Sequence, residues 1–198
     1  IQGIENTQRI INGVYRLEVK ANTEFPEVPL TLIPTYPDLP MEEVYPRVAQ
    51  TDIPEVYLRE VGQGRVVYFP WDIDRIFWEI LCVDHGKILS NAVVWASNEP
   101  TPVTVSGQGV LDVTIWRQAN SMTVHMVNLT NPMMMKGPIR EFIPLGAQEV
   151  RVLLPEDYKV KGVKFLKSET TPDYQIVDGY LEVTVPSILD YEVLAIDF

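Results

Sequence analysis

The sequence predicts an α/β region followed by an all-β region, and three observations lead to this fold class. Residues 1–98 mix short strand-like runs with helical spacing after Pro70. A turn-rich polar stretch, SNEPTP (97–102), then separates two regions that differ in their pattern of apolar and polar residues. From Val103 onward the chain holds only strand-like runs divided by turn residues, which is typical of an antiparallel β-sandwich. We therefore predict one domain over 1–98 and a second over 101–198.

The first region begins with strand-like runs. GVYRLEVKA (13–21) alternates apolar and polar residues, as a half-buried strand does. PLTLIPTYP (29–37) is a short β-rich run, and its prolines lead into an extended loop. EVYLREV (55–61) and GRVVYFP (64–70) flank Gly62-Gln63-Gly64, which predicts a hairpin or another tight connection.

Two helices are predicted after Pro70. Asp72 or Asp74 is expected to cap a short helix that runs through Leu81, and Asp84 to cap a second one. The apolar residues of the second helix recur at roughly helical spacing: Ile88, Leu89, Ala92, Val93 and either Trp95 or Ala96.

Six runs predict the strands of the sandwich. They are VLDVTIWRQ (110–118), MTVHMVNLT (122–130), EVRVLLP (149–155), VKGVKFLKS (160–168), YLEVTVP (180–186) and YEVLAIDF (191–198). Each run alternates or stays apolar over five to nine residues, and turn signals separate them.

The composition excludes several classes of protein. Lys and Arg total 16 against 27 for Asp and Glu, a net charge of -11 that argues against nucleic acids and anionic membranes as partners. A single cysteine, Cys82, leaves no internal disulfide and no Cys-based zinc site. We expect neither a metal nor a cofactor. One cysteine fits the cytoplasm and the periplasm alike, with the cytoplasm slightly favoured, and a chain that begins with Ile1 is expected to be processed or part of a longer protein.

The densest group of ionisable residues comprises Asp72, Asp74, Asp84 and His85. One interpretation is a metal or acid/base site. The favoured interpretation is that the carboxylates lie at helix starts and form local salt bridges, with Arg75 as a partner.

Other motifs carry weaker signals. His125 lies in an alternating strand and is expected to be packed, and Cys82 lies in an apolar run and is expected to be buried and inert. Asn128-Leu129-Thr130 matches the glycosylation sequon. Three consecutive methionines (133–135) predict either an exposed apolar contact surface or a flap over the core.

Three stretches together resemble a known arrangement. GRVVYFPWDIDRIFWEILCVDHGKILSNAVVWA (64–96) resembles the last strand and helices of the β-galactosidase trimerisation-type domain, which has a class I glutamine-amidotransferase-like fold. GVLDVTIWRQANSMTVHMVNLTNPMMMKGPIREFIPLG (109–146) and VPSILDYEVLAIDF (185–198) resemble the small β-sandwich that follows it. This arrangement is familiar at the C-terminal end of bacterial glycoside-hydrolase-like proteins related to family 42 β-galactosidases.

The resemblance implies a non-catalytic role. Such proteins begin with a (β/α)8 barrel that carries the two catalytic carboxylates, and nothing in this sequence corresponds to it. The resemblance therefore implies an accessory and oligomerisation region, with the barrel of the same polypeptide and further copies of the chain as partners. No catalytic residue carries over, and Cys82 stands in a helix-like run rather than at the strand-to-helix elbow of an amidotransferase nucleophile.

Two alternatives remain open. Trp71 and Trp78 are candidates for an interface with a neighbouring domain or subunit. In a carbohydrate-binding module, Trp116 would instead stack on sugar rings together with Tyr158, Tyr174 or Tyr180. A freestanding hydrolase that uses the aspartates and His85 is the less favoured alternative.

Overall fold

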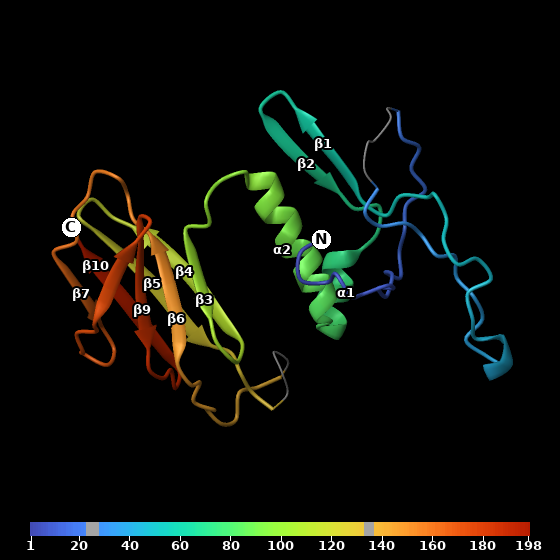
Figure 1. Cartoon of the computed structure of the whole chain (residues 1–198). Helices are drawn as coiled ribbons and strands as arrows, with labels where there is room; N and C mark the ends of the chain where they lie inside the picture. Colours follow the sequence, from blue (N-terminus) through green and yellow to red (C-terminus); the bar gives the residue numbers. More distant parts are fainter. Residues whose placement is uncertain (23–27, 133–136) are drawn as a thin grey trace. The chain divides into compact units, whose positions relative to one another are not determined.

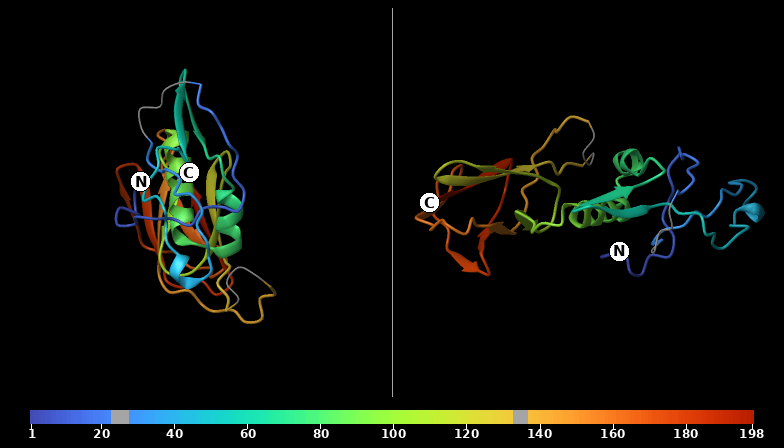
Figure 2. Two further views of the ribbon diagram at one scale, coloured as in Figure 1. Left: turned by 90° about the vertical axis from the view of Figure 1, so that its right-hand side faces the viewer. Right: turned by 90° about the horizontal axis from the view of Figure 1, so that it is seen from above.

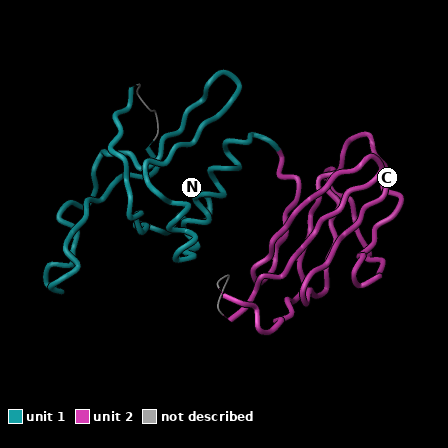
Figure 3. Tube along the Cα trace, turned by 180° about the vertical axis from the view of Figure 1, so that it is seen from behind, with its two compact units in different colours: residues 1–99 teal, residues 100–198 magenta. Residues whose placement is uncertain are grey.

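The computed structural model describes residues 1–22, 28–132 and 137–198, and the chain divides into two compact units, 1–99 and 100–198 (Figures 1 and 3). Unit 1 contains η1 (Met41–Glu43), β1 (Tyr57–Val61), β2 (Gly64–Tyr68), α1 (Ile73–Ile80) and α2 (Val83–Ser97). Unit 2 contains β3 (Val103–Ser106), β4 (Leu111–Arg117), β5 (Ser121–Asn128), β6 (Gln148–Leu153), β7 (Gly162–Phe165), β8 (Tyr174–Val177), β9 (Tyr180–Val185) and β10 (Tyr191–Asp197).

Unit 2 is an antiparallel β-sandwich, which confirms the predicted fold of this region. One sheet has the strand order β4-β5-β10-β7 and the other β3-β6-β9-β8. Every pair of neighbours is antiparallel. Figure 1 shows the two sheets face to face. Alternate side chains of the central strands point inward, so Val124, Val152, Leu181, Leu194 and Ile196 are fully buried between the sheets.

The six predicted sandwich strands are confirmed, and the structure adds β3 and β8. Each of these two strands is only four residues long. Strands this short offer too few alternations for a periodic pattern to be recognised, because the period of a strand is two residues. The predicted methionine surface (133–135) lies outside the described residues.

Unit 1 contains the predicted hairpin. Val61 pairs with Gly64, so Gly62 and Gln63 form the turn between β1 and β2. Gly62 has a φ of +62°, a left-handed conformation that glycine adopts without steric cost. Helix α2 packs against β2.

The predicted strand over 13–21 is wrong. Only Arg16 forms a β-bridge there, with Trp71, and the chain is otherwise extended and mostly exposed. The Leu17 amide donates to the Pro70 carbonyl at 2.7 Å. The segment that pairs with Arg16 turns into helix α1 two residues after Trp71. It therefore does not continue as a strand, and no longer ladder forms there.

The β-rich run over 29–37 likewise forms one bridge, between Thr31 and Pro54. The Leu32 and Glu55 amides donate to the Ile53 and Leu30 carbonyls on the two sides of this bridge. The Ile53 amide and the Glu55 carbonyl bond to the side chains of Thr51 and Trp71, so they do not extend the ladder. The proline-marked loop that follows carries η1 and extends away from the helices of unit 1 (Figures 1 and 2).

The two predicted helices are present. Asp72 occupies the N-cap position of α1, as predicted, although its side chain makes no capping hydrogen bond. The predicted Asp84 cap is wrong, because the N-cap residue of α2 is Cys82. Asp74 and Asp84 lie in the first turns, where a carboxylate is favourable next to the helix dipole. Of the helices in the described ranges, none is long and apolar enough to cross a membrane.

Gly86 allows the two helices to approach closely. A Cβ atom at this position would stand 3.0 Å from Cε2 of Phe77 on α1. The absence of a side chain therefore lets the Phe77 ring lie against the backbone of α2.

Leu194 provides a test of the sandwich core. It is fully buried on β10, and Leu194→Ala is expected to lower the free energy of unfolding by about 2–5 kcal/mol through lost burial and a residual cavity. Urea unfolding followed by circular dichroism measures the change. Leu189→Ala, at a half-exposed position, is the matched control and is expected to change stability by less than about 0.5 kcal/mol. Equal effects of the two substitutions would contradict the assigned register of β10.

Candidate functional site

Trp71 lies at the centre of unit 1. Only 8% of the residue is exposed, and its Nε1 donates a hydrogen bond of 2.9 Å to the Glu55 carbonyl. Its ring meets Phe69 and His85 edge-on, with centroids 6.4 Å and 5.8 Å away. The indole is therefore covered by residues of its own unit.

His85 is completely buried on α2. Its Nε2 lies 2.7 Å from the Ile11 carbonyl, which can only accept, so Nε2 carries the hydrogen. None of the described residues forms a hydrogen bond with Nδ1. His85 thus fastens the N-terminal segment to the helix, and its side chain has no access to solvent.

Asp72 connects the extended segment to the start of α1. Its Oδ1 accepts the Tyr15 amide at 3.1 Å, and its Oδ2 lies 3.3 Å from Nη1 of Arg75. Arg75 also donates to Glu79 at 2.8 Å, and this hydrogen bond raises the pKa of the guanidinium above its ordinary value. The salt bridges expected around Arg75 are therefore present.

The other two aspartates do not converge on His85. Asp74 is exposed and Asp84 is half-buried, each in the first turn of a different helix. Within 1–22, 28–132 and 137–198, no group of three or more His, Cys, Asp or Glu residues could hold a metal ion. Cys82, expected to be buried, is partly exposed.

The structure brings together an ion pair, between the partly exposed Arg16 and the buried Glu55, that the sequence analysis missed. Glu55 is 5% exposed, and Nε of Arg16 donates to its Oε1 at 2.5 Å. Its backbone is also held, because its amide donates to the Leu30 carbonyl at 2.9 Å. The two side chains are 39 residues apart, so no local pattern could have identified the pair.

Trp78 and Trp116, the other two tryptophans considered as contact residues, are exposed. Trp78 on α1 is 54% exposed, and Trp116 on β4 is 61% exposed. Trp116 stands opposite Thr123 and beside Thr114 and His125, on the outer face of its sheet. Both tryptophans can therefore contact other molecules.

The aromatic residues proposed for sugar stacking do not form one row. Trp116 belongs to the sheet of β4, whereas Tyr174 and Tyr180 belong to the other sheet. Tyr158 packs against Phe198, with ring centroids 5.0 Å apart. Tyr180 lies beneath the Arg151 guanidinium.

Two further side chains have structural roles. Asn128 of the sequon is 3% exposed, and its amide nitrogen donates to the carbonyls of Ile143 and Leu189. In the folded chain this nitrogen is inaccessible for glycosylation. His125 bonds Thr123 along the same strand, at 3.2 Å.

Comparison with known proteins finds similarity in structure but not in sequence family. Neither a protein-family model nor a curated protein matches this chain. The α-L-fucosidase isoenzyme 2 from Paenibacillus thiaminolyticus matches in structure with a TM-score of 0.60 and 18% identity, over 75% of this chain and 23% of the fucosidase. The chain is similar in fold to part of a glycoside hydrolase. A catalytic mutant of Gan42B, a GH42 β-galactosidase from G. stearothermophilus, matches with a TM-score of 0.39 and 15% identity, over 74% of this chain and 16% of the galactosidase.

The role of Asp72 can be tested by hydrogen exchange. Asp72→Ala removes the acceptor of the Tyr15 amide, so this amide is expected to exchange about five- to tenfold faster, which corresponds to the net worth of roughly one hydrogen bond. Amide exchange followed by NMR measures the rate. Asp74→Ala, on the same helix turn but exposed, is the control and should leave the Tyr15 rate unchanged. An unaltered rate in Asp72→Ala would show that Asp72 does not hold the segment.

Proposed function

We propose that this chain is a non-catalytic accessory region of a larger glycoside hydrolase. The observation that carries the proposal is the fold similarity with the fucosidase, which extends over three-quarters of this chain but under a quarter of that enzyme. In the proposed arrangement, a (β/α)8 barrel elsewhere in the same polypeptide supplies the catalytic carboxylates. The chain described here packs against the barrel and supports assembly of the enzyme.

The contacts of the ionisable residues support a non-catalytic role. Asp72 and Arg75 are engaged in hydrogen bonds that hold unit 1 together. His85 is completely buried and faces the Ile11 carbonyl. These side chains have the environment of structural residues, which weakens the alternative of a freestanding hydrolase built on them.

We further propose that residues 1–98 are the C-terminal part of an amidotransferase-like, trimerisation-type domain. The hairpin of β1 and β2 is a two-stranded sheet whose outer edges have no strand partner among the described residues. An isolated hairpin of this kind is at best marginally stable, and unpaired edges favour pairing with another segment. Further strands from the same polypeptide would complete this sheet.

Exposed apolar residues on the helices support self-association. Trp78 on α1 and Val83 and Val93 on α2 are each more than half exposed. Large apolar side chains are enriched in the cores of interfaces and depleted on free surfaces. We therefore propose a homo-oligomer in which the helices of unit 1 contribute to the contact.

An activity assay tests the catalytic part of the proposal. The native polypeptide, captured from its source with an antibody against this chain, is expected to have a greater mass than the 198-residue chain and to hydrolyse an aryl β-galactoside or α-fucoside. The purified 198-residue chain is expected to hydrolyse neither. Activity of the chain alone, lost in Asp74→Ala, would overturn the proposal in favour of a freestanding hydrolase.

Sedimentation velocity tests the assembly part. The isolated chain is expected to self-associate, and Trp78→Ala to weaken association at least tenfold, because a central interface aromatic typically contributes about 2 kcal/mol or more. Leu189→Ala, which truncates an exposed apolar residue of unit 2, is the control and should have no effect. A monomeric chain, or equal effects of both substitutions, would argue against the helices of unit 1 as the interface.

A further inference from the structure

Residues 34–50 form an arm that projects from unit 1 (Figures 1 and 2). Within this fully described range the regular structure is limited to η1, and loops longer than about 12–15 residues without their own secondary structure are uncommon and usually functional. The base of the arm is closed, because the Leu32 amide donates to the Ile53 carbonyl at 2.8 Å and Thr31 bridges Pro54. The arm therefore leaves unit 1 from a fixed point.

The tip of the arm is locally ordered and apolar. The Glu43 amide donates to the Pro40 carbonyl at 2.8 Å, and the Glu43 side chain pairs with Arg47. Leu39 is 71% exposed and Met41 is 76% exposed. Large apolar side chains are enriched in interface cores, and a tip that is ordered before it binds loses less conformational freedom on binding. These properties favour a contact surface.

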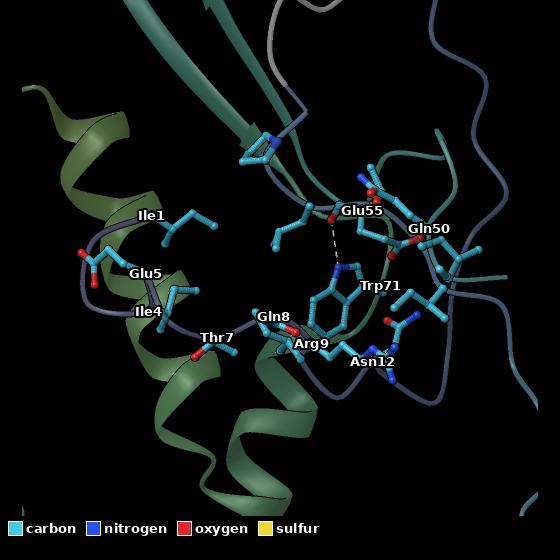
Figure 4. A pocket seen from close by; sticks show the side chains of 17 residues that line it. Ile1, Ile4, Glu5, Thr7, Gln8, Arg9, Asn12, Gln50, Glu55 and Trp71 are labelled. Atoms are coloured by element: carbon cyan, nitrogen blue, oxygen red, sulfur yellow. Dashed lines mark hydrogen bonds between the residues drawn. The ribbon is translucent and has the colours of Figure 1, made fainter. Parts of the chain in front are cut away.

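The base of the same arm borders a half-open hollow of about 460 Å³. Residues 29–33 and 49–50, which flank the arm, contribute to its wall together with the N-terminal segment. In Figure 4, Ile4 stands on one side of the Trp71 indole and Gln50 on the other. The hollow thus lies where the arm begins and ends.

The hollow offers accessible apolar surface to the tip. The half-buried aliphatic residues of its wall are Ile10, Leu30, Leu32 and Ile33. Its volume lies within the range of pockets that take small organic molecules, about 300–1,000 Å³. The side chains of Leu39 and Met41 are therefore of a size and polarity that the hollow accommodates.

The charges of the tip and of the hollow are complementary. Glu42 on the tip and Arg9 on the wall are both exposed, and neither has an ion-pair partner within 1–22, 28–132 and 137–198. The other charged residue at the N-terminal wall, Glu5, is already engaged. A hydrogen bond from the Gly3 amide lowers the pKa of its carboxyl, and the nearby charge of Lys87 acts in the same direction. The uncompensated charge is thus negative on the tip and positive at the hollow.

The position of the hollow makes the fit reciprocal. When two copies of the arm lie side by side in opposite directions, the tip of each arm reaches the base of the other. A two-fold contact repeats each interaction, so the same contact between tip and hollow forms twice. Within one copy the arm points away from its own hollow, so the tip does not fill it (Figures 1 and 2).

We propose that the tip of the arm docks into the hollow of a second copy of this chain, with Leu39 and Met41 against the aliphatic wall and Glu42 paired with Arg9. The contact adds a second surface to the self-association proposed above, which involves Trp78 and the helices. It does not depend on the glycoside hydrolase assignment, because it requires only residues of this chain.

Disulfide trapping in the full 198-residue chain tests the contact. Its single cysteine is first removed by Cys82→Ser, and Met41→Cys on the tip is then combined with Thr7→Cys on the wall. A disulfide requires Cα atoms within about 7 Å, so mild oxidation is expected to give a covalent dimer that a reductant dissolves. Met41→Cys combined with Val93→Cys, an exposed position on α2, is the matched control and should give little dimer.

Surface variants measure the two parts of the contact by sedimentation equilibrium. Leu39→Asp is expected to weaken dimerisation at least tenfold, because it places a charge against an apolar wall in both halves of the dimer. Leu189→Asp, at an exposed apolar position of unit 2, is the control and should have no effect. Glu42→Arg and Arg9→Glu are each expected to weaken dimerisation about threefold or more, and the double variant to restore it.

Three results would overturn the proposal. They are a yield of covalent dimer from Met41→Cys with Thr7→Cys that does not exceed the control pair, equal association of Leu39→Asp and Leu189→Asp, and a double charge reversal that fails to restore what the single changes lose. Trp78→Ala separates this contact from that of the helices, because it should leave the trapped dimer in place. None of these outcomes bears on whether a longer polypeptide carries glycosidase activity, so failure here is distinguishable from failure of the proposed function.

Discussion

Trp71 joins segments of unit 1 that are far apart in the sequence. Its backbone bridges Arg16, its indole nitrogen binds the Glu55 carbonyl, and its ring packs against His85 on α2. The first 56 residues of the unit contain no strand or α-helix in their described part, so few regular backbone ladders hold them. Burial of one large aromatic ring with a satisfied N–H therefore provides much of the constraint that positions them.

The buried carboxylates of the two units differ in how completely they are hydrogen-bonded. In the sandwich, Glu192 accepts the backbone amides of Lys167, Ser168 and Val193, so both of its oxygens are used. In unit 1, Arg16 satisfies one oxygen of Glu55, and none of the described groups satisfies the other. The unsatisfied oxygen of Glu55 therefore carries a desolvation cost that the fully bonded Glu192 avoids.

The packing of the units also differs. The sandwich buries a continuous apolar core, with Val124, Leu181 and Leu194 completely enclosed. Unit 1 has a small core around Trp71 and leaves Trp78 and Val93 on its helices exposed. Unit 2 thus has a core of its own, whereas unit 1 leaves apolar side chains on its helices uncovered.

The sequence by itself determined the elements whose signals are local. Six of the sandwich strands follow from alternation, and the hairpin follows from the glycine-containing turn at Gly62. Only the tertiary structure decided which of these segments find partners. The run over 13–21 alternates like a strand but meets just one bridging residue, Asp72 binds the Tyr15 amide instead of capping its helix, and Glu55 is buried beside Arg16. These outcomes depend on contacts across 39 or more residues, and periodicity reports only on neighbours a few residues away.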